Sequence, residues 1–312
     1  MAEKIATREA YGNALVEFGA KYEDLIVLDA DVSSATKTAA FGKKFPERFI
    51  NCGIAEGNMM SVAAGIATTG KIPFASSFAM FAAGRAFEPI RNAIGYPHLN
   101  VKIGATHAGV TVGEDGATHQ CCEDIGIMRT IPGMVIINPA DAVEARAAVE
   151  AAILYKGPVY LRFGRLAVPV IFDKETYKFE FGKGAQISEG KDASIIATGI
   201  MVAEAIKARE ILAADGIDAA VVNIHTIKPI DKDIIIKAAK TGAVITAEEH
   251  NIIGGLGSAV AEVLAENSPC LMGRIGVKDE FGRSGKAEEL MKVFGITAED
   301  IVKKVKEVVN KK

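Results

Sequence analysis

The stretch Leu25-Ile-Val-Leu-Asp-Ala30 decides the fold class, because it is a short apolar run between two segments with helical periodicity. Such a run is typical of a strand that is buried on both faces of a parallel sheet. The flanking helices are expected over residues 7–20 and 58–69. The alternation continues, with strands expected near 72–77, 100–106, 134–138 and 159–163 and helices near 84–95, 120–130 and 141–155. We therefore predict a doubly wound α/β domain with mostly parallel strands.

The alternation is interrupted over residues 168–190, where aromatic, charged and glycine residues mix without a helical period. A second series begins at Ala193-Ser-Ile-Ile-Ala197 and continues with strands near 219–224 and 243–247 and helices near 201–213, 231–240, 255–266 and 297–312. We predict two doubly wound α/β domains, residues 1–172 and 191–312, with residues 173–190 as the linker.

The composition excludes several classes of protein. The chain has 312 residues, of which 49% are hydrophobic and 24% charged, as in a globular protein. The net charge of −3 and the absence of a basic block argue against nucleic-acid binding. The sequence has no apolar run of membrane-spanning length and no signal peptide, so we expect a cytoplasmic protein that does not contact a membrane. The four cysteines have no C-x-x-C spacing, so neither a metal site nor a disulfide framework is predicted.

Three stretches lie where strands are expected to end and helices to begin, which is where open α/β sheets bind ligands. They are residues 51–58, 76–81 and 105–120. The third has two histidines, His107 and His119, with two carboxylates and three glycines in one loop, which favours a functional site over a solvated surface loop. Their spacing does not fit a zinc helix. Taken alone, Glu56 would be an acid at a helix start, and Phe78 and Phe81 would be core residues.

Together the three stretches resemble the transketolase family. The resemblance depends on Gly53-Ile-Ala-Glu56-Gly, Ser77-Phe78-Ala-Met-Phe81, Thr106-His107 and Gly113-Glu-Asp-Gly-Ala-Thr-His-Gln120. It extends over the whole chain, through the pyrimidine-binding domain and then a C-terminal domain with Thr246-Ala-Glu-Glu-His-Asn-Ile-Ile-Gly-Gly-Leu-Gly257. It implies a thiamine diphosphate enzyme of the pentose phosphate pathway type, which transfers a two-carbon ketol unit between sugar phosphates.

The resemblance also assigns roles in cofactor binding. Glu56 matches the carboxyl group that bonds to a ring nitrogen of the cofactor's pyrimidine and favours its imino tautomer, which makes Glu56 both a catalytic and a cofactor-binding residue. Phe78 and Phe81 match the aromatic residues that hold the pyrimidine ring by stacking. Asp31 matches an acid near the cofactor.

Five residues are matched to the substrate channel. His107 and His119 would relay protons to and from sugar hydroxyls, and His107 and Asp115 would also bind the substrate. Arg8 and Arg165 match two arginines that clamp the sugar phosphate, a task that suits the planar guanidinium.

The sequence departs from the family pattern at three places. Ala108 stands where an aspartate usually follows the first histidine, and Gly84 where a third aromatic residue often completes the pyrimidine pocket. The segment Asp31-Val-Ser-Ser-Ala35 lacks the usual Pro-Ser ending, so a serine contact to phosphate is not expected. Cofactor activation is unaffected by these changes, but the identity of the sugar phosphate stays open.

No Gly-Asp-Gly motif followed by an asparagine is present, although the family uses this signature to bind Mg²⁺ and the diphosphate. We therefore expect a partner chain, an N-terminal transketolase subunit that holds Mg²⁺, in a heterotetramer of the α2β2 type with the cofactor at the interface. Three alternatives remain: a deoxyxylulose phosphate synthase-like subunit, a 2-oxo acid dehydrogenase β-type subunit, and a non-catalytic scaffold subunit. His107 and the 113–120 loop favour transketolase over the first two, and the retained glutamate, aromatic residues and histidines argue against the third.

Overall fold

The computed structural model describes residues 3–312, and its largest sheet has seven strands in the order β12-β6-β7-β5-β4-β2-β3. All neighbouring strands are parallel except β12, which is antiparallel to β6. The strands are β2 (Leu25–Asp29), β3 (Phe49–Asn51), β4 (Ile72–Phe78), β5 (Lys102–Thr106), β6 (Val135–Ile137), β7 (Val159–Arg162) and β12 (Thr226–Lys228).

Helices cover both faces of this sheet. Leu25 and Val27 pack in one core cluster with residues of α1 and α7, whereas Leu28 packs in another with residues of α4 and η3. Alternate residues of one strand therefore face different helix layers, as a doubly wound sheet requires. The helical segments are α1 (Thr7–Gly19), α2 (Ser33–Thr36), α3 (Ala39–Lys44), η1 (Pro46–Arg48), α4 (Glu56–Ala67), η2 (Met80–Arg85), α5 (Phe87–Pro89), η3 (Ile90–Gly95), η4 (Val110–Asp115), α6 (Asp124–Arg129) and α7 (Ala142–Leu154).

A second sheet has the order β14-β13-β10-β11-β9, in which β9 is antiparallel to its neighbour and the other pairs are parallel. Its strands are β9 (Ala185–Ser188), β10 (Ala193–Ala197), β11 (Ala219–Asn223), β13 (Ala243–Asn251) and β14 (Leu271–Val277). The helices of this half are α8 (Met201–Ala214), α9 (Lys232–Ala239), α10 (Leu256–Asn267), α11 (Ala287–Val293) and α12 (Ala298–Val309). The predicted start of the last helix is capped by Thr297, which accepts a hydrogen bond from the Asp300 amide in a capping box.

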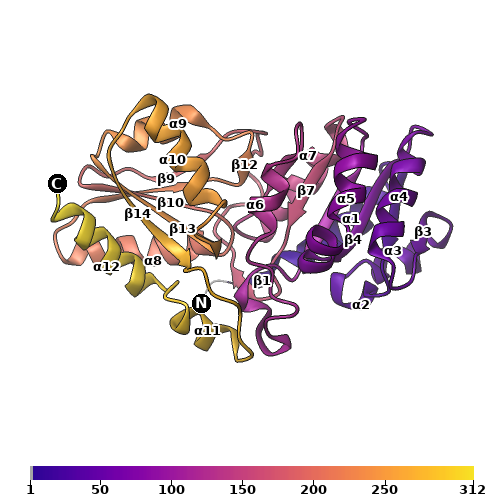
Figure 1. The fold of residues 1–312 in the computed structure, drawn as a ribbon, viewed down its shortest axis with the longest axis horizontal. Coiled ribbons are helices and arrows are strands. Elements are labelled where there is room, and N and C mark those ends of the chain that lie inside the picture. Colours follow the sequence, from indigo (N-terminus) through magenta and orange to yellow (C-terminus); the bar gives the residue numbers. More distant parts are fainter. Residues whose placement is uncertain (1–2) are drawn as a thin grey trace.

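The two sheets lie side by side, and the strand β12 crosses from the C-terminal half of the chain to join the N-terminal sheet (Figure 1). A third, two-stranded sheet pairs β1 (Lys4–Ala6) with β8 (Ala167–Pro169). Two doubly wound units with mostly parallel strands were predicted, and this fold class is confirmed. The strands β1, β3, β8, β9, β12 and β14 and the helical segments α2, α3, η1, η4 and α11 were not predicted, and β9 lies inside the expected linker. In residues 3–312 no helix is both long and apolar enough to cross a bilayer.

Candidate functional site

The carboxyl ends of β2, β4, β5 and β7 meet at one edge of the seven-stranded sheet, because these strands run parallel in register. Phe78 is the last residue of β4, and His107 follows β5 directly. Arg165 lies three residues beyond the end of β7, and Asp31 two residues beyond the end of β2. The topology therefore gathers residues that are far apart in sequence.

Glu56 is the first residue of α4, and its side chain is only 2% exposed. The Arg85 guanidinium Nη1 donates hydrogen bonds to both of its carboxylate oxygens, at 2.9 and 3.1 Å. The same guanidinium lies over the ring of Phe81, 4.8 Å from its centroid. Arg85 is itself about half exposed, so this ion pair closes the outer side of a buried carboxylate. Sequence reasoning missed Arg85, although a lone cation in a helix of small residues could have been noticed.

Two phenylalanines and two histidines form one aromatic cluster. The rings of Phe78 and Phe81 are stacked with centroids 5.6 Å apart. His107 stacks on Phe78 at 3.9 Å, and His119 meets the ring of Phe81 edge-on at 5.3 Å. The structure thus brings together four of the residues predicted for the site, from β4, η2 and the loop at 107–120.

The imidazole of His107 is held in one tautomer by its neighbours. Its Nε2 lies 2.8 Å from Nη1 of Arg8, and its Nδ1 lies 2.8 Å from the hydroxyl of Thr106. A guanidinium can only donate, so Nε2 accepts and the ring proton is on Nδ1. Burial lowers the pKa of His107 to about 3, and the charges of Arg8 and Arg165 contribute to the shift in the same direction. His107 is therefore a neutral imidazole at neutral pH.

Arg8 and Arg165 lie at the border between the two halves of the chain. Burial lowers the pKa of Arg8, and the positive charge of Arg165 contributes to the same shift, so the two guanidinium groups are close enough to repel. Arg165 donates to the carbonyl of Val112 and lies 3.3 Å from a carboxylate oxygen of Asp115. Arg165 thus contacts the 107–120 loop at Val112 and at Asp115.

A cavity of about 410 Å³ opens beside the two arginines. Its lining includes Arg8, Thr111, Val112, Arg165, Lys286 and Glu288. Lys286 belongs to the C-terminal half, directly before α11, and is a third cation at this cavity that sequence reasoning missed. Three cations and two acids, Glu114 and Glu288, leave the lining with a net positive charge, which favours an anionic ligand.

Within residues 3–312, Asp31 makes no hydrogen bond or ion pair with any other residue that was predicted for the site. Its exposed carboxylate accepts a hydrogen bond of 3.0 Å from the side chain of Asn51. The buried acid of the same segment is Asp29, which accepts bonds from the Val32 amide and from the hydroxyls of Thr36 and Thr38. Asp29 fixes the turn that presents the carbonyl of Ala35 to Arg8.

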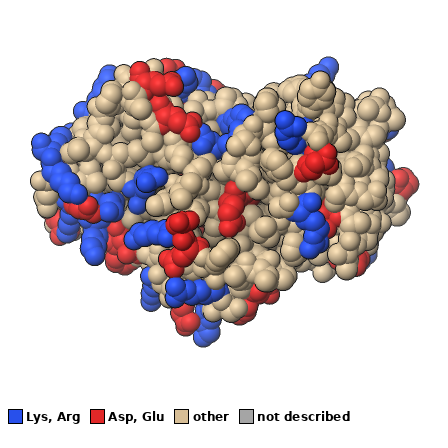
Figure 2. Space-filling model, viewed as in Figure 1, with Lys and Arg blue, Asp and Glu red and all other residues tan. Residues whose placement is uncertain are grey.

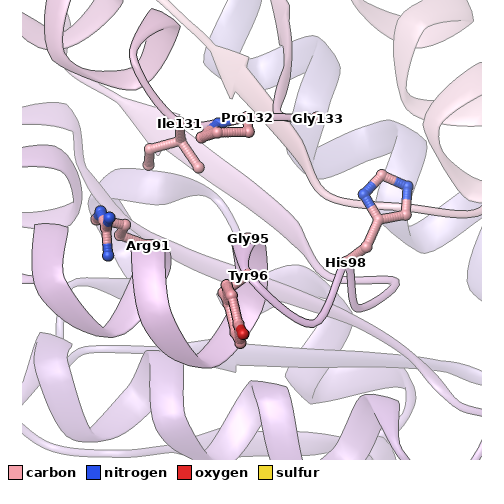
Figure 3. A pocket seen from close by; sticks show the side chains of 7 residues that line it. All are labelled: Arg91, Gly95, Tyr96, His98, Ile131, Pro132 and Gly133. Atoms are coloured by element: carbon pink, nitrogen blue, oxygen red, sulfur yellow. The ribbon is translucent and has the colours of Figure 1, made fainter.

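Another cavity, of about 330 Å³, lies beyond the C-terminal end of η3. Figure 3 shows Arg91, Tyr96 and His98 around it, with the 131–133 loop on the opposite side. It shares no residue with the three stretches at the sheet edge. In residues 3–312 no group of three histidine, cysteine or acidic side chains could hold a metal ion.

Comparisons with known proteins identify the domains of the chain. Residues 3–170 match the family model of the transketolase pyrimidine-binding domain, and residues 182–301 match that of the transketolase C-terminal domain. The chain belongs to the transketolase family. Thiamine diphosphate is the cofactor that this family uses, and the chain contains the pyrimidine-binding domain for it.

Several relatives are similar over nearly their whole length. A protein of Methanocaldococcus jannaschii, provisionally named a transketolase C-terminal section, is 56% identical over 97% of this chain and 96% of its own. A 6-deoxy-6-sulfo-D-fructose transketolase subunit of a Clostridium species is 44% identical over 98% of this chain and 95% of its own. A solved structure described as a split-gene transketolase in an inactive β4 tetramer has a TM-score of 0.92 and 53% identity, over 98% of this chain and 99% of that one. Human transketolase, by contrast, is matched over 50% of its length at 35% identity.

The residues present fit the pyrimidine end of the cofactor. A buried carboxyl group can form a hydrogen bond with a ring nitrogen of an aminopyrimidine, and a stacked aromatic pair can contact the face of that ring. Glu56 and the stacked pair Phe78–Phe81 provide these contacts, and the guanidinium of Arg85 lies between Glu56 and Phe81. Glu56 would hold the ring nitrogen, and the phenylalanines would hold the ring face.

Proposed function

We propose that this chain is the pyrimidine-binding subunit of a two-chain transketolase, which transfers a two-carbon ketol unit between sugar phosphates. The observation that carries the proposal is the convergence of Glu56, the Phe78–Phe81 pair and two histidines at one sheet edge, next to an arginine-lined cavity. Thiamine diphosphate, when bound, supplies the nucleophilic carbon that carries the ketol unit.

The chain's own residues would have three roles: cofactor binding, proton exchange with bound sugar hydroxyls, and binding of the sugar's terminal anion. Glu56 would hold the pyrimidine through a shared proton, and the phenylalanines would orient the ring. His119 would exchange protons with sugar hydroxyls, while His107 and Asp115 would bind and orient them. Arg8 and Arg165 would clamp the terminal anion of the sugar by paired hydrogen bonds. The cations that surround the cavity support this last assignment.

We also propose a partner subunit that binds the diphosphate and Mg²⁺, in an assembly of the α2β2 type. Relatives that this chain covers almost completely are named as transketolase subunits. The N-terminal half presents few charged side chains in the view of Figure 2, whereas the C-terminal half is densely charged. Ile54, 78% exposed just before Glu56, is an apolar contact available to a partner on the cofactor side.

The cavity beside Arg8, Arg165 and Lys286 supports a proposal for the substrate class. Its positive lining suits a tetrahedral anion at the far end of a sugar, which includes both a phosphate and a sulfonate. The relatives named for 6-deoxy-6-sulfo-D-fructose and for apulose 4-phosphate use sugars with such a group. We propose a ketose phosphate as the donor for this chain.

The test is a ketol-transfer assay with xylulose 5-phosphate and ribose 5-phosphate, thiamine diphosphate and Mg²⁺. The chain is assayed alone, then mixed with the candidate diphosphate-binding subunit, and co-elution of the two is measured by size-exclusion chromatography. We expect activity in the mixture only. Activity of the chain alone, or a stable complex with no ketol transfer on any sugar phosphate tried, would overturn the proposal.

Glu56→Gln separates an enzyme subunit from a scaffold. The amide keeps the size of the side chain but cannot share a proton with the ring, so we expect at least about a hundredfold loss of turnover. Co-elution with the partner should be unchanged. An unchanged rate would favour the scaffold alternative, and turnover of pyruvate with an aldehyde phosphate, or of a 2-oxo acid, would identify the synthase or dehydrogenase alternatives.

A further inference from the structure

The 107–120 loop, which contains His107, Asp115 and His119, is held by the C-terminal half of the chain. Glu249 lies in β13, is 3% exposed, and accepts a hydrogen bond from the backbone amide of Thr111 at 2.6 Å. The contact joins residues 138 positions apart. A carboxylate that accepts from a backbone amide in a buried place makes one of the stronger hydrogen bonds in proteins.

The backbone of the loop is shaped to allow this contact. Gly109 has φ of +79°, and a Cβ atom there would lie 2.3 Å from the carboxyl carbon of Glu249 and 2.4 Å from Oε1. Any side chain at position 109 would therefore have to displace the glutamate. The glycine and the glutamate fit each other as a pair, although they belong to different halves of the chain.

The far end of the loop is anchored to the same region of β13. Arg162 Nη2 donates to the carbonyl of Glu249 at 2.9 Å and to that of Cys121 at 3.3 Å. The amide of Asn251 donates to the carbonyl of Cys122 at 2.8 Å. Gln120 is tied to the carbonyl of Arg283. The loop is thus fixed on both sides of the segment that contains Asp115 and His119.

Asp115 and His119 lie in the more exposed part of this segment, and their polar contacts are to exposed or neighbouring groups. Asp115 contacts Arg165, and His119 lies 2.9 Å from the hydroxyl of its neighbour Thr118. Their placement therefore depends on where the buried parts of the loop are held. The bond from Thr111 to Glu249 is such an anchor on the N-terminal side, four residues before Asp115.

We propose that Glu249 is a positioning residue for ketol transfer, which sets the 107–120 loop through the amide of Thr111. The role of the C-terminal domain in this chain is then to hold the substrate loop in place. Burial raises the pKa of Glu249 to about 7, and the charge of Arg162 opposes that shift. The proposal rests on the proposed function for its kinetic part, but the anchor itself can be tested on the chain alone.

The experiment compares Glu249→Met with Glu249→Gln. Both side chains are uncharged and similar in size to glutamate, but only glutamine can accept the Thr111 amide proton. Glu248 provides the matched control, because it lies on the same strand, is fully buried, and accepts hydrogen bonds from the Leu256 and Gly257 amides of its own half. The variants are therefore Glu249→Met, Glu249→Gln and Glu248→Met.

The first readout is hydrogen–deuterium exchange of the chain by itself. We expect Glu249→Met to increase exchange across residues 107–120, with Glu249→Gln close to wild type. Glu248→Met should increase exchange at the start of α10 only. If Glu249→Met leaves the 107–120 loop protected, or if Glu248→Met exposes the loop equally, the proposal is wrong.

The second readout is the kinetics of the reconstituted two-chain enzyme. We expect Glu249→Met to lower kcat by roughly tenfold to a hundredfold, as for a catalytic group displaced by about 1 Å, with thiamine diphosphate affinity unchanged. Glu249→Gln should restore most of the rate. Equal rates for Glu249→Met and wild type would overturn the proposal. If the wild-type pair shows no ketol transfer, the proposed function fails while the exchange result still decides the anchor.

If Glu249→Met does not fold, Glu249→Asp replaces it. The shorter carboxylate keeps the charge but withdraws the acceptor from Thr111, so loop exchange should rise in that variant as well. An Asp variant with full protection of the 107–120 loop would refute the anchor.

Discussion

Gly109→Ala should destabilise this protein more than an ordinary glycine substitution at positive φ. At φ +79° and ψ −173° the backbone of Gly109 is in a region that is essentially restricted to glycine. The new Cβ would also lie 2.3 Å from the carboxyl carbon of Glu249, well inside van der Waals contact. The substitution therefore adds two separate costs, one from the backbone and one from the clash.

The magnitudes can be separated with a control. The backbone cost is about 1–3 kcal/mol, and overpacking of a buried contact adds roughly 1–3 kcal/mol. Gly216 has φ of +80° and nothing within 4 Å of its ideal Cβ, so Gly216→Ala has only the backbone cost. Adding the two ranges, we expect Gly109→Ala to lose about 2–6 kcal/mol of unfolding free energy, at least about 1 kcal/mol more than Gly216→Ala.

Urea unfolding followed by circular dichroism measures both variants. A double-mutant cycle completes the test, because Glu249→Ala removes the atoms that the new methyl group at position 109 would strike. In that background the cost of Gly109→Ala should fall by the clash contribution, roughly 1–3 kcal/mol, and only its backbone cost should remain. Equal losses for Gly109→Ala and Gly216→Ala, or the same cost of Gly109→Ala with and without Glu249, would refute the reasoning.

Two further predictions concern the site, and a third concerns Glu144, a fully buried glutamate in the first turn of α7. Arg85→Met should cost about 1–3 kcal/mol of unfolding free energy in the isolated chain, because the buried carboxylate of Glu56 loses its hydrogen-bond and ion-pair partner. The same substitution should cost clearly less in a Glu56→Gln background, and the urea midpoints of the four proteins decide this. Lys286→Met removes one cation from the cavity, so it should raise KM for a ketose phosphate about fivefold at constant kcat and leave KM for an unphosphorylated ketose unchanged. Steady-state assays of the two-chain enzyme would check this. Burial raises the pKa of Glu144 to about 7 from 4.5, so the folded state binds the proton of this carboxyl group more tightly than the unfolded state does. The protonated carboxyl therefore contributes its full stabilisation below pH 4.5, and this contribution is lost as pH rises through about 7. The full loss is about 3 kcal/mol, of which roughly 2.5 kcal/mol falls between pH 5 and pH 8. Unfolding free energies at these two pH values should show that the stability advantage of wild type over Glu144→Gln narrows or reverses by that smaller amount as pH rises.

The fold class could be predicted from the sequence because its strands are buried on both faces. Runs such as Ala193–Ala197 are almost entirely apolar, and every residue of that strand is buried. The short strand Thr226–Lys228 could not be predicted, because so short a segment has no period and its partner Val135–Ile137 lies some 90 positions earlier. Its place is decided by the packing of the two halves against each other, for which no local pattern exists.

The site was only partly predictable for a related reason. Glu56, Phe78 and Phe81 each had an ordinary structural explanation when taken alone, and the family resemblance grouped them before the geometry did. Arg85 and Lys286 were missed because a surface cation has many possible neighbours. Glu249 could have been noticed from the sequence, because two acids and a histidine follow one another in a strand that is otherwise mostly apolar. Such residues need polar partners when they are buried. That signal could have indicated an interface between the two halves.

The two histidines of the loop are not equivalent in proton chemistry. His107 has its Nε2 lone pair engaged by Arg8 and its Nδ1 proton engaged by Thr106, and the surrounding positive charges oppose its protonation. It can hold and orient a hydroxyl only after Arg8 moves toward another acceptor. An anion in the adjoining cavity is such an acceptor, so the binding of the sugar's far end and the release of His107 would be linked through one guanidinium. His119 is partly exposed and its Nδ1 contacts the hydroxyl of Thr118, so proton exchange with the substrate is better assigned to His119.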